Sequence, residues 1–378
     1  MSSEAVASRI RDAERSRRAV RIVAAGTWLH AGGPVGAADT LSLPDDRGNV
    51  EYVPGDLTLT AGAGTPIAEL VAAVHANDQW LPLDPWGGDD GTLGATLSTA
   101  TAGPHSHAMG LASDVALGLG FVSGTGDVIR AGGRVVKNVA GFDLTRLVIG
   151  AWGSLGVITE ATLRLRARPA ALRTFLLDVD TRAEALSQLA VAMRMLPFTP
   201  VASELVNGPL ARHLGLRSDT TMVVRITGNA NAVNAQTSAL RKLGRLSDAP
   251  AAIWRRLRES DHDARDGATW RWSQSPSAFG DTWSGAERAT RGVDQPLIHG
   301  NPLRGVVRVV ARGNAATLRA CVSGGTGTLA VETFATREGR LALQESPERR
   351  RNPALERPIR DTFDPARVLN PGILGEGD

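Results

Sequence analysis

The segment from Gly132 to Leu165 constrains the fold of this 378-residue chain more than any other part of its sequence. It places Lys137 and Asn138 in a glycine-rich loop, and it continues as a helical pattern, a second glycine turn and an alternating strand. Lys137 is one of only two lysines in the chain, where arginine supplies nearly all the other positive charges. The loop therefore indicates a site that admits a compact ammonium group but not a planar guanidinium, with codon drift as the open alternative.

Composition and charge exclude several classes of protein. The chain is 42% hydrophobic and 21% charged, which is typical of a soluble globular protein of two or three domains. Its formal net charge is only +3 and its basic residues are scattered, so no nucleic-acid partner is expected. Cys321 is the only cysteine, so the chain alone can form neither a disulfide nor an iron–sulfur cluster. No apolar run reaches about 18 residues and no signal-peptide pattern is present, so we expect a cytoplasmic protein without a transmembrane segment.

Three glycine-rich turns follow predicted strands early in the chain, at 24–33, 61–65 and 87–103. Each can present consecutive backbone N–H groups to an anion without obstruction by side chains. Together they predict an extended ligand that carries phosphate. A Rossmann dinucleotide site is not predicted, because Ile67 stands where its third glycine belongs.

Residues that could bind a metal or act as a nucleophile do not form a recognisable set. His105 and His107 flank Ser106, but no second pair of ligands has a suitable spacing, so no metal site is predicted. Ser154 lies in the sequence GSLG, which does not match the G-x-S-x-G nucleophile motif.

The sequence pattern changes after Pro169. The elements predicted there are strands at 173–179, 201–206 and 220–227 and helices at 181–196 and 229–243, the first helix with a capping box of Thr181 and Glu184. This order is most of a split βαβ unit, which forms an antiparallel sheet with helices on one face. Residues 255–300 contain tryptophans but few periodic signals. They are read as a loop region that covers a pocket, with aromatic side chains inserted into the core as the open alternative.

Two motifs resemble the signature of a flavoprotein family. Residues 133–147 read GRVVKNVAGFDLTRL, and residues 153–160 read GSLGVITE. They closely resemble the FAD-linked oxidases that have a PCMH-type FAD domain, also called the vanillyl-alcohol-oxidase type. The similarity continues in AGAGTPI at 61–67, GTLGA at 91–95 and NPG at 370–372. Within the family, the chain looks most like the FAD-binding subunits of glycolate oxidase.

The resemblance implies an α+β fold. Residues 1–170 would form a PCMH-type FAD-binding domain of two α/β subdomains. Residues 171–355 would form a smaller cap domain with an antiparallel sheet and helices, and residues 356–378 would return to the FAD-binding domain. The implied cofactor is FAD, bound non-covalently.

The resemblance also implies which residues contact FAD. Backbone N–H groups of the first glycine turn would hold the pyrophosphate, and the later loops would line the ribityl chain and the nucleotide. The expected cofactor-binding residues are Val23, Ala24, Ala25, Gly26, Thr27, Thr92, Gly94, Thr99, Gly103, Ser113, Lys137, Asn138, Gly141, Gly156, Val157 and Ile158. Asn370 would lie near the edge of the isoalloxazine.

The implied reaction is oxidation of a small 2-hydroxy acid, of the glycolate or D-lactate type, by hydride transfer to flavin N5. Arg271 or Arg304 is expected to bind the substrate carboxylate, because bidentate recognition of a carboxylate favours arginine. His299 is expected to accept the hydroxyl proton. With Asn370, Arg271 and His299 form the expected catalytic set.

Electrons would then pass to oxygen, to a quinone or to partner subunits. The family resemblance implies an iron–sulfur subunit and a second flavoprotein subunit, through which the chain would be peripheral to the inner membrane. Two alternatives remain open. One is a non-catalytic FAD-binding subunit that relays electrons or completes an assembly, which the lack of the family's His-rich metal site favours. The other is a stand-alone oxidase of a sugar or alcohol.

Overall fold

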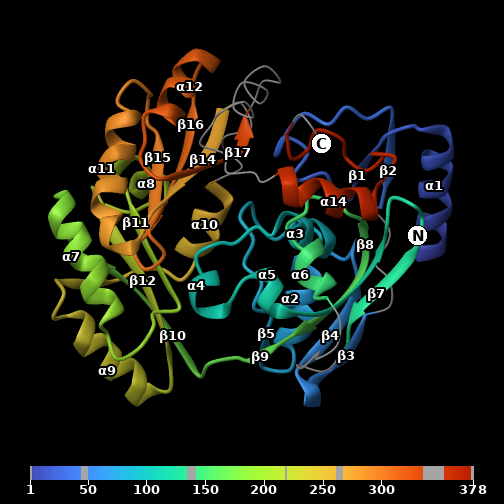
Figure 1. Cartoon of the computed structure of the whole chain (residues 1–378). Coiled ribbons are helices and arrows are strands. Elements are labelled where there is room, and N and C mark those ends of the chain that lie inside the picture. Colours follow the sequence, from blue (N-terminus) through green and yellow to red (C-terminus); the bar gives the residue numbers. More distant parts are fainter. Residues whose placement is uncertain are drawn as a thin grey trace. The chain divides into compact units, whose positions relative to one another are not determined.

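The computed structural model describes residues 2–43, 50–133, 142–217, 219–260, 267–334 and 353–375 (Figure 1). The chain forms two compact units, each assembled from segments that are distant in the sequence. The first unit consists of Met1–Ala102, Gly110–Arg168 and Arg350–Asp378, and the second of Gly103–Met109 and Pro169–Arg349. The expected domain boundaries after residues 170 and 355 stay a prediction, because a domain is defined by independent folding.

The first unit is built on a five-stranded antiparallel sheet with the order β3-β4-β8-β6-β7. A parallel pair, β1 and β2, and an antiparallel pair, β5 and β9, accompany it. The strands are β1 (Val20–Val23), β2 (Asp39–Ser42), β3 (Glu51–Val53), β4 (Thr58–Gly62), β5 (Gln79–Trp80), β6 (Ala116–Val122), β7 (Val128–Gly132), β8 (Val157–Arg164) and β9 (Arg166–Ala167). β8 is the alternating strand expected after the second glycine turn.

Helices accompany these sheets, and the longer ones such as α1 and α2 bury an apolar face. In the described part of the first unit they are α1 (Ser3–Ser16), the 3-10 helix η1 (Pro54–Asp56), α2 (Ile67–His75), α3 (Leu93–Thr99), α5 (Ala112–Val115), α6 (Leu144–Val148) and α14 (Pro353–Phe363). α1 begins where the Ser2 hydroxyl accepts a backbone N–H of its first turn. Its buried residues, such as Val6 and Ile10, share one hydrophobic core with Val20 of β1 and Val122 of β6. A second core lies around α2, α3, β4 and β8.

The C-terminal segment that follows α14 returns to β1. Leu369 pairs with Val20 in a parallel bridge, and the Val20 N–H donates to the Val368 carbonyl at 2.7 Å. The fully buried carboxylate of Asp364 accepts the N–H groups of Val368 at 2.9 Å and Leu369 at 3.0 Å. Burial raises the pKa of Asp364, although these two N–H groups and the charge of Arg360 act in the opposite direction. The segment is thus fixed to the first unit by strand pairing and by buried hydrogen bonds.

The second unit is built on an eight-stranded antiparallel sheet with the order β13-β10-β12-β11-β15-β16-β14-β17. Its strands are β10 (Ala171–Leu177), β11 (Ala202–Val206), β12 (Thr221–Gly228), β13 (Leu246–Asp248), β14 (Gly267–Ser273), β15 (Leu297–Asn301), β16 (Val306–Arg312) and β17 (Thr328–Phe334). Its described helices are α4 (Ser106–Met109), α7 (Ala183–Arg194), α8 (Gly208–His213), α9 (Ala230–Leu240), α10 (Ile253–Glu259), η3 (Pro276–Ala278), α11 (Phe279–Ala289) and α12 (Ala315–Ser323).

One face of this sheet carries the hydrophobic core of the second unit. Helices α7, α9, α11 and α12 contribute residues to that core, together with alternate residues of the strands. The intervening strand residues point to the opposite face, because side chains alternate along a strand. Several of these intervening residues are polar or ionisable, among them Glu204, His299 and Arg308. The mixture of helices with antiparallel sheets confirms the α+β fold class.

The interpretation of residues 255–300 as a loop region is wrong. They contain α10, β14, α11 and β15, and Trp270, Trp272 and Trp283 are fully buried in the core. The alternation Trp270-Arg271-Trp272 is the period-two signal of a strand with one apolar face. The expected capping box is also wrong, because α7 begins after Arg182 without a side-chain cap.

Candidate functional site

The first unit contains a cavity of about 110 Å³ between the end of β1, the start of α3, the turn before β8 and the C-terminal segment. Glycine, alanine, serine and threonine supply half of its lining residues, and Arg21 and Trp28 are among the larger ones. Its lining includes Ile22, Ala24, Gly26, Thr27, Ala63, Gly94, Ala95, Ser98, Thr99, Trp152, Gly153, Gly156, Val157, Ile158, Asn370 and Ile373. A cavity of this composition recognises a ligand mainly through backbone groups and shape.

The glycine turn after β1 offers backbone donors to this cavity. The N–H groups of Ala24, Gly26, Thr27 and Trp28, four residues that line the cavity, form no hydrogen bond within the described part of the chain. Consecutive backbone N–H groups in a turn that do not bond to other parts of the protein can bind an anionic ligand. The Thr27 hydroxyl oxygen is buried and also has no hydrogen-bond partner. These donors fit the pyrophosphate of a dinucleotide such as FAD.

Three glycines allow chain segments to approach one another around the cavity. A Cβ atom at Gly94 would lie 2.8 Å from the Cβ of Ala63, and one at Gly156 would lie 2.6 Å from Phe121. A Cβ atom at Gly153 would lie 2.8 Å from the Asn370 amide nitrogen, and Gly153 also has a φ of +72°. Any other residue at these positions would enter occupied space, so the cavity depends on the absence of side chains.

Eight residues of the expected cofactor-binding set line this cavity. They are Ala24, Gly26, Thr27, Gly94, Thr99, Gly156, Val157 and Ile158, and Asn370 joins them from the expected catalytic set. Five other expected residues do not line it. They are Val23, Ala25, Thr92, Gly103 and Ser113, of which Thr92 caps α3 and Gly103 belongs to the second unit. Lys137, Asn138 and Gly141 lie outside the described residues, so their roles stay a prediction.

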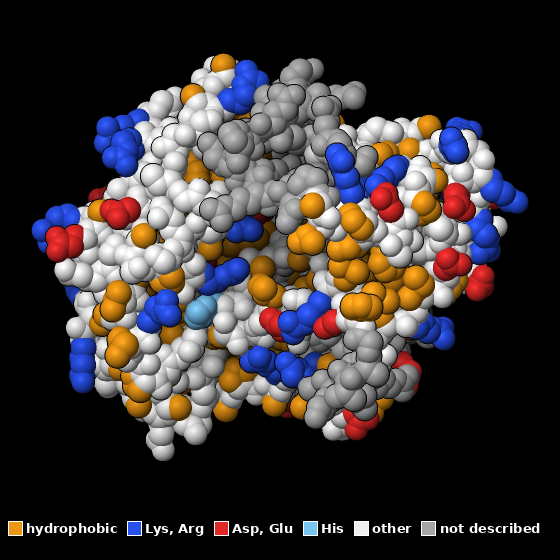
Figure 2. All heavy atoms as spheres, in the orientation of Figure 1, with side chains coloured by type: hydrophobic (Ala, Val, Ile, Leu, Met, Phe, Trp, Pro, Cys, Tyr) orange, Lys and Arg blue, Asp and Glu red, His pale blue; other side chains and the backbone are white. Residues whose placement is uncertain are grey.

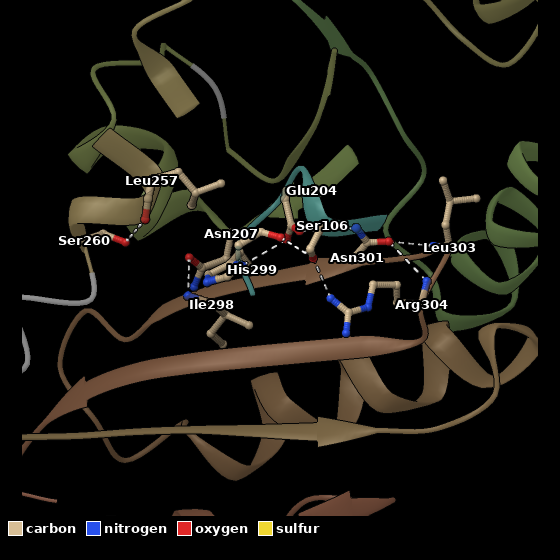
Figure 3. A network of polar contacts seen from close by, with 11 residues as sticks. Ser106, Glu204, Asn207, Leu257, Ser260, Ile298, His299, Asn301, Leu303 and Arg304 are labelled. Carbon is tan, nitrogen blue, oxygen red and sulfur yellow. Dashed lines mark hydrogen bonds and ion pairs between the residues drawn. The ribbon is translucent and has the colours of Figure 1, made fainter. Parts of the chain in front are cut away.

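The second unit carries a buried polar network on the sheet face opposite its hydrophobic core (Figure 3). His299 Nδ1 lies 3.0 Å from Glu204 Oε2, and both side chains are almost fully buried. The Asn301 amide nitrogen donates to the other Glu204 oxygen at 3.5 Å. The Asn301 carbonyl oxygen in turn accepts the N–H groups of Leu303 and Arg304 at 3.0 and 3.1 Å. Glu204 therefore orients His299, and Asn301 shapes the turn that carries Arg304.

Arg304 is partly buried and carries its positive charge without an ion pair among the described residues. Its Nη1 donates to the Ser106 hydroxyl at 2.9 Å, and that hydroxyl donates to the Gly103 carbonyl at 2.6 Å. Burial lowers the pKa of Arg304 and the charge of Arg271 lowers it further, against the opposite effect of Glu204. Arg304 contacts a hydroxyl group, whereas Arg271 contacts a carboxylate, and this difference decides which of the two is available to bind an anion.

Arg271, the expected carboxylate-binding residue, is engaged within the protein. Its Nε lies 3.3 Å from Glu332 Oε1, and the same oxygen lies 2.6 Å from Nη1 of Arg308. Burial would raise the pKa of Glu332, but the charges of Arg308 and then Arg271 outweigh burial and hold the pKa below its usual value. Glu332 therefore interacts with Arg271 and Arg308 together. Arg271 and His299 lie on the two strands that flank β16, each opposite Arg308.

Sequence reasoning missed Glu204, Asn301 and Ser106 as site residues. Glu204 is a lone carboxylate in an otherwise apolar strand, VASELV, and such a position is a usable signal because charged residues are rarely buried without a partner. Asn301 and Ser106 carry no comparable signal, because their contacts depend on segments that are distant in sequence.

Three further features of the described residues concern the distribution of surface charge, possible metal ligands and possible membrane-spanning helices. Figure 2 shows Lys and Arg side chains dispersed over the visible face, with Asp and Glu side chains among them. Among the described residues, no group of three or more His, Cys, Asp or Glu side chains is placed to hold a metal ion. No helix within the described ranges has the length and apolar character needed to cross a membrane.

Comparisons with known proteins agree with the cavity in the first unit. Residues 1–132 match a family described as FAD binding domain. The chain is 30% identical to glycolate oxidase subunit GlcE of Escherichia coli over 259 residues, which cover 68% of each protein. It is 33% identical to glycolate oxidase subunit GlcD of Bacillus subtilis over 147 residues, or 38% of this chain and 31% of that one.

A solved structure supports the fold. The structure of p-cresol methylhydroxylase with substrate bound matches 99% of this chain and 87% of its own, with a TM-score of 0.75 at 17% identity. The backbone donors, the buried Thr27 hydroxyl and the glycine contacts fit FAD in the first unit. The chain therefore belongs to the FAD-linked oxidase family that includes glycolate oxidase subunit GlcE, and it is an FAD-dependent oxidoreductase.

Proposed function

We propose that this protein oxidises a small 2-hydroxy acid to the 2-oxo acid and passes the electrons to a partner protein or another acceptor. Bound FAD would supply a two-electron acceptor for the hydride from the substrate α-carbon. The residues of this chain would bind the carboxylate, accept the hydroxyl proton and hold the cofactor. The names of the GlcE and GlcD relatives support glycolate as one substrate to test.

The observation that carries the proposal is the environment of Arg304. A partly buried guanidinium is unfavourable unless an anion or several hydrogen bonds compensate it. Within the described residues, Arg304 has one hydroxyl partner and a second arginine nearby, but no ion pair. A substrate carboxylate would complete this site, because a guanidinium can donate two parallel hydrogen bonds to it. We therefore favour Arg304 over Arg271, whose charge Glu332 already balances.

His299 is the proposed base for the hydroxyl proton. The Glu204 carboxylate at 3.0 Å favours the tautomer in which Nδ1 carries the proton, so Nε2 is the basic nitrogen. Glu204 also stabilises the imidazolium that proton uptake would create. This arrangement supports general base catalysis, which typically accelerates a reaction by about 10²–10⁴-fold.

A second function remains a candidate because the relative that shares 68% of its length with this chain is named as a subunit. In that case the chain would bind FAD and relay electrons within an assembly, while another subunit oxidises the substrate. The same cavity serves both functions, so they differ only in the role of Arg304 and His299.

Anaerobic reduction of the purified, FAD-loaded chain separates the two functions. Glycolate, D-lactate and related 2-hydroxy acids are added in turn, and flavin absorbance is followed by stopped flow. We expect bleaching by at least one acid and slower bleaching, by about 10²-fold or more, in His299→Gln. Dithionite serves as the control, because it should reduce every variant.

A yellow protein that dithionite bleaches and no hydroxy acid bleaches would favour the relay function. Unchanged bleaching in His299→Gln would remove His299 from the mechanism while leaving the oxidation itself intact. A colourless protein that does not take up added FAD would contradict both functions.

A further inference from the structure

Asn370 joins two walls of the FAD cavity through its side-chain amide. The amide oxygen accepts the Ile22 N–H at 2.9 Å, and the amide nitrogen donates to the Trp152 carbonyl at 2.8 Å. Ile22 lies in β1, directly before the turn with the unused backbone donors. Trp152 lies in the turn before β8, directly before Gly153. One side chain therefore connects segments that are about 130 residues apart in the sequence.

The backbone around Asn370 fixes this side chain in place. Asn370 is only 7% exposed, and its N–H donates to the Val20 carbonyl at 3.0 Å. Its φ is +43°, a left-handed conformation that asparagine tolerates better than most residues other than glycine. The carbonyl of Ile373, three residues later, accepts the Gly33 N–H at 2.7 Å. The segment is thus bonded to both ends of the glycine turn.

The chemistry of the position requires an amide. The Ile22 N–H needs an acceptor and the Trp152 carbonyl needs a donor, and asparagine supplies both from one planar group. Aspartate would keep the acceptor but would set a carboxylate oxygen against the Trp152 carbonyl. The cavity wall at Gly153 adds a steric requirement, because a Cβ atom there would lie 2.8 Å from the Asn370 amide nitrogen.

We propose that Asn370 is a positioning residue for FAD. It holds the β1 turn and the turn before β8 at the separation that the dinucleotide needs, so the backbone donors are preorganised before the cofactor binds. This role concerns cofactor affinity rather than the reacting atoms. It rests on FAD binding by the family and not on the proposed oxidation of a hydroxy acid, so it stands or fails independently of that function.

Three variants of Asn370 test the proposal through FAD affinity. Asn370→Gly keeps the left-handed backbone accessible but removes both hydrogen bonds, Asn370→Asp keeps only the acceptor, and Asn370→Ala adds backbone strain to the loss of both bonds. The dissociation constant for FAD is measured with the apoprotein by flavin fluorescence, and the melting temperature is measured without FAD. We expect the constant to rise about 5- to 100-fold in Asn370→Gly. It should rise further in Asn370→Asp, where a buried carboxylate faces the Trp152 carbonyl, and in Asn370→Ala, where the backbone is strained.

Asn229→Ala provides a matched control. Asn229 caps α9 in the second unit by accepting the Ala232 N–H at 2.9 Å, so its loss should lower stability without touching the cavity. We expect this variant to melt earlier and to bind FAD normally. The proposal is overturned if the Asn370 variants also melt earlier but keep the parental FAD affinity, because Asn370 would then be a structural residue only. It is also overturned if FAD affinity stays normal while substrate reduction is lost, because Asn370 would then act on the reaction.

Discussion

The FAD cavity of the first unit and the polar network of the second unit differ in the residues that form them. Half of the residues that line the cavity are glycine, alanine, serine or threonine, and backbone N–H groups of its first turn are available as donors. The network consists of polar and ionisable side chains, such as Glu204, His299 and Arg308, that are buried on one face of a sheet. The comparison teaches that an added atom damages the first site, whereas a removed functional group damages the second.

Arg304→Gln should have the largest effect and should act on the second site alone. Removing a charged hydrogen-bond donor to the carboxylate should raise the KM for a 2-hydroxy acid by about 10- to 100-fold. FAD affinity should stay unchanged. Stability should not fall, because the change also removes the repulsion between Arg304 and Arg271. Steady-state kinetics and thermal melting measure these quantities, with the exposed Arg288→Gln as the control. An unchanged KM would show that Arg304 does not bind the substrate.

Gly94→Ala tests the first site by adding one methyl group. Its Cβ would lie 2.8 Å from the Ala63 Cβ and 3.1 Å from the Ala63 carbonyl, so α3 must shift. We expect a loss of about 1–3 kcal/mol in stability and about tenfold in FAD affinity. Gly36→Ala is the matched control, because a Cβ atom there has no neighbour within 4 Å. Equal behaviour of the two variants would contradict a cavity that depends on close backbone approach.

Thr27→Val tests whether the Thr27 hydroxyl contributes to FAD binding or to the stability of the apoprotein. The Thr27 oxygen is buried without a hydrogen-bond partner, so an isosteric methyl should stabilise the apoprotein by about 1 kcal/mol. If the hydroxyl donates to FAD, the dissociation constant should rise by about fivefold. Calorimetry of the apoprotein should therefore show a gain in stability, whereas an FAD titration should show a loss of affinity. An apoprotein that is more stable and binds FAD as tightly as before would exclude this contact.

The pH dependence of the second unit should show the smallest effect. Burial lowers the pKa of His107 from its usual value of 6.5, and the charges of Arg304 and Arg194 lower it further. The unfolded chain therefore binds this proton more tightly, and stability is present above pH 6.5 and is lost as the pH falls through the folded pKa. His107→Gln should flatten the fall in melting temperature on acidification by about 1 °C. A steeper fall in the variant would contradict this sign.

The sequence predicted the first site better than the second for a physical reason. Backbone-built turns leave a local signal, because glycines at fixed spacing are needed wherever chain segments approach a ligand. The glycine turn at 24–33 carries this signal, whereas Gly94 and Gly156 were assigned through the family resemblance, and the structure places both glycines in the lining of the cavity. The Glu204–His299 pair joins two strands 95 residues apart, and no local pattern reports such a contact. Arg271 was proposed because recognition of a carboxylate favours arginine, but only the structure shows that Glu332 balances its charge.

The same reasoning explains the partial success with the fold. Strands and helices with a clear period, such as β8 and α9, were found within a few residues of their ends. The region 255–300 was misread because α11 mixes glycine, serine and tryptophan, and its helical face is visible only after Trp283 is known to be buried. Burial by distant segments decides such elements, and a single sequence does not encode it locally.

The order in which the ribosome makes this chain has a consequence for cofactor loading. The first unit contains segments on both sides of the second unit, and its cavity takes part of its wall from Asn370 and Ile373. While residues 169–349 are being synthesised, the early glycine turns exist without that wall. The nascent chain therefore cannot present the complete cavity before Asn370 and Ile373 have been synthesised. Holoprotein assembly should be a post-translational event, and any stalled or prematurely terminated product would be released colourless.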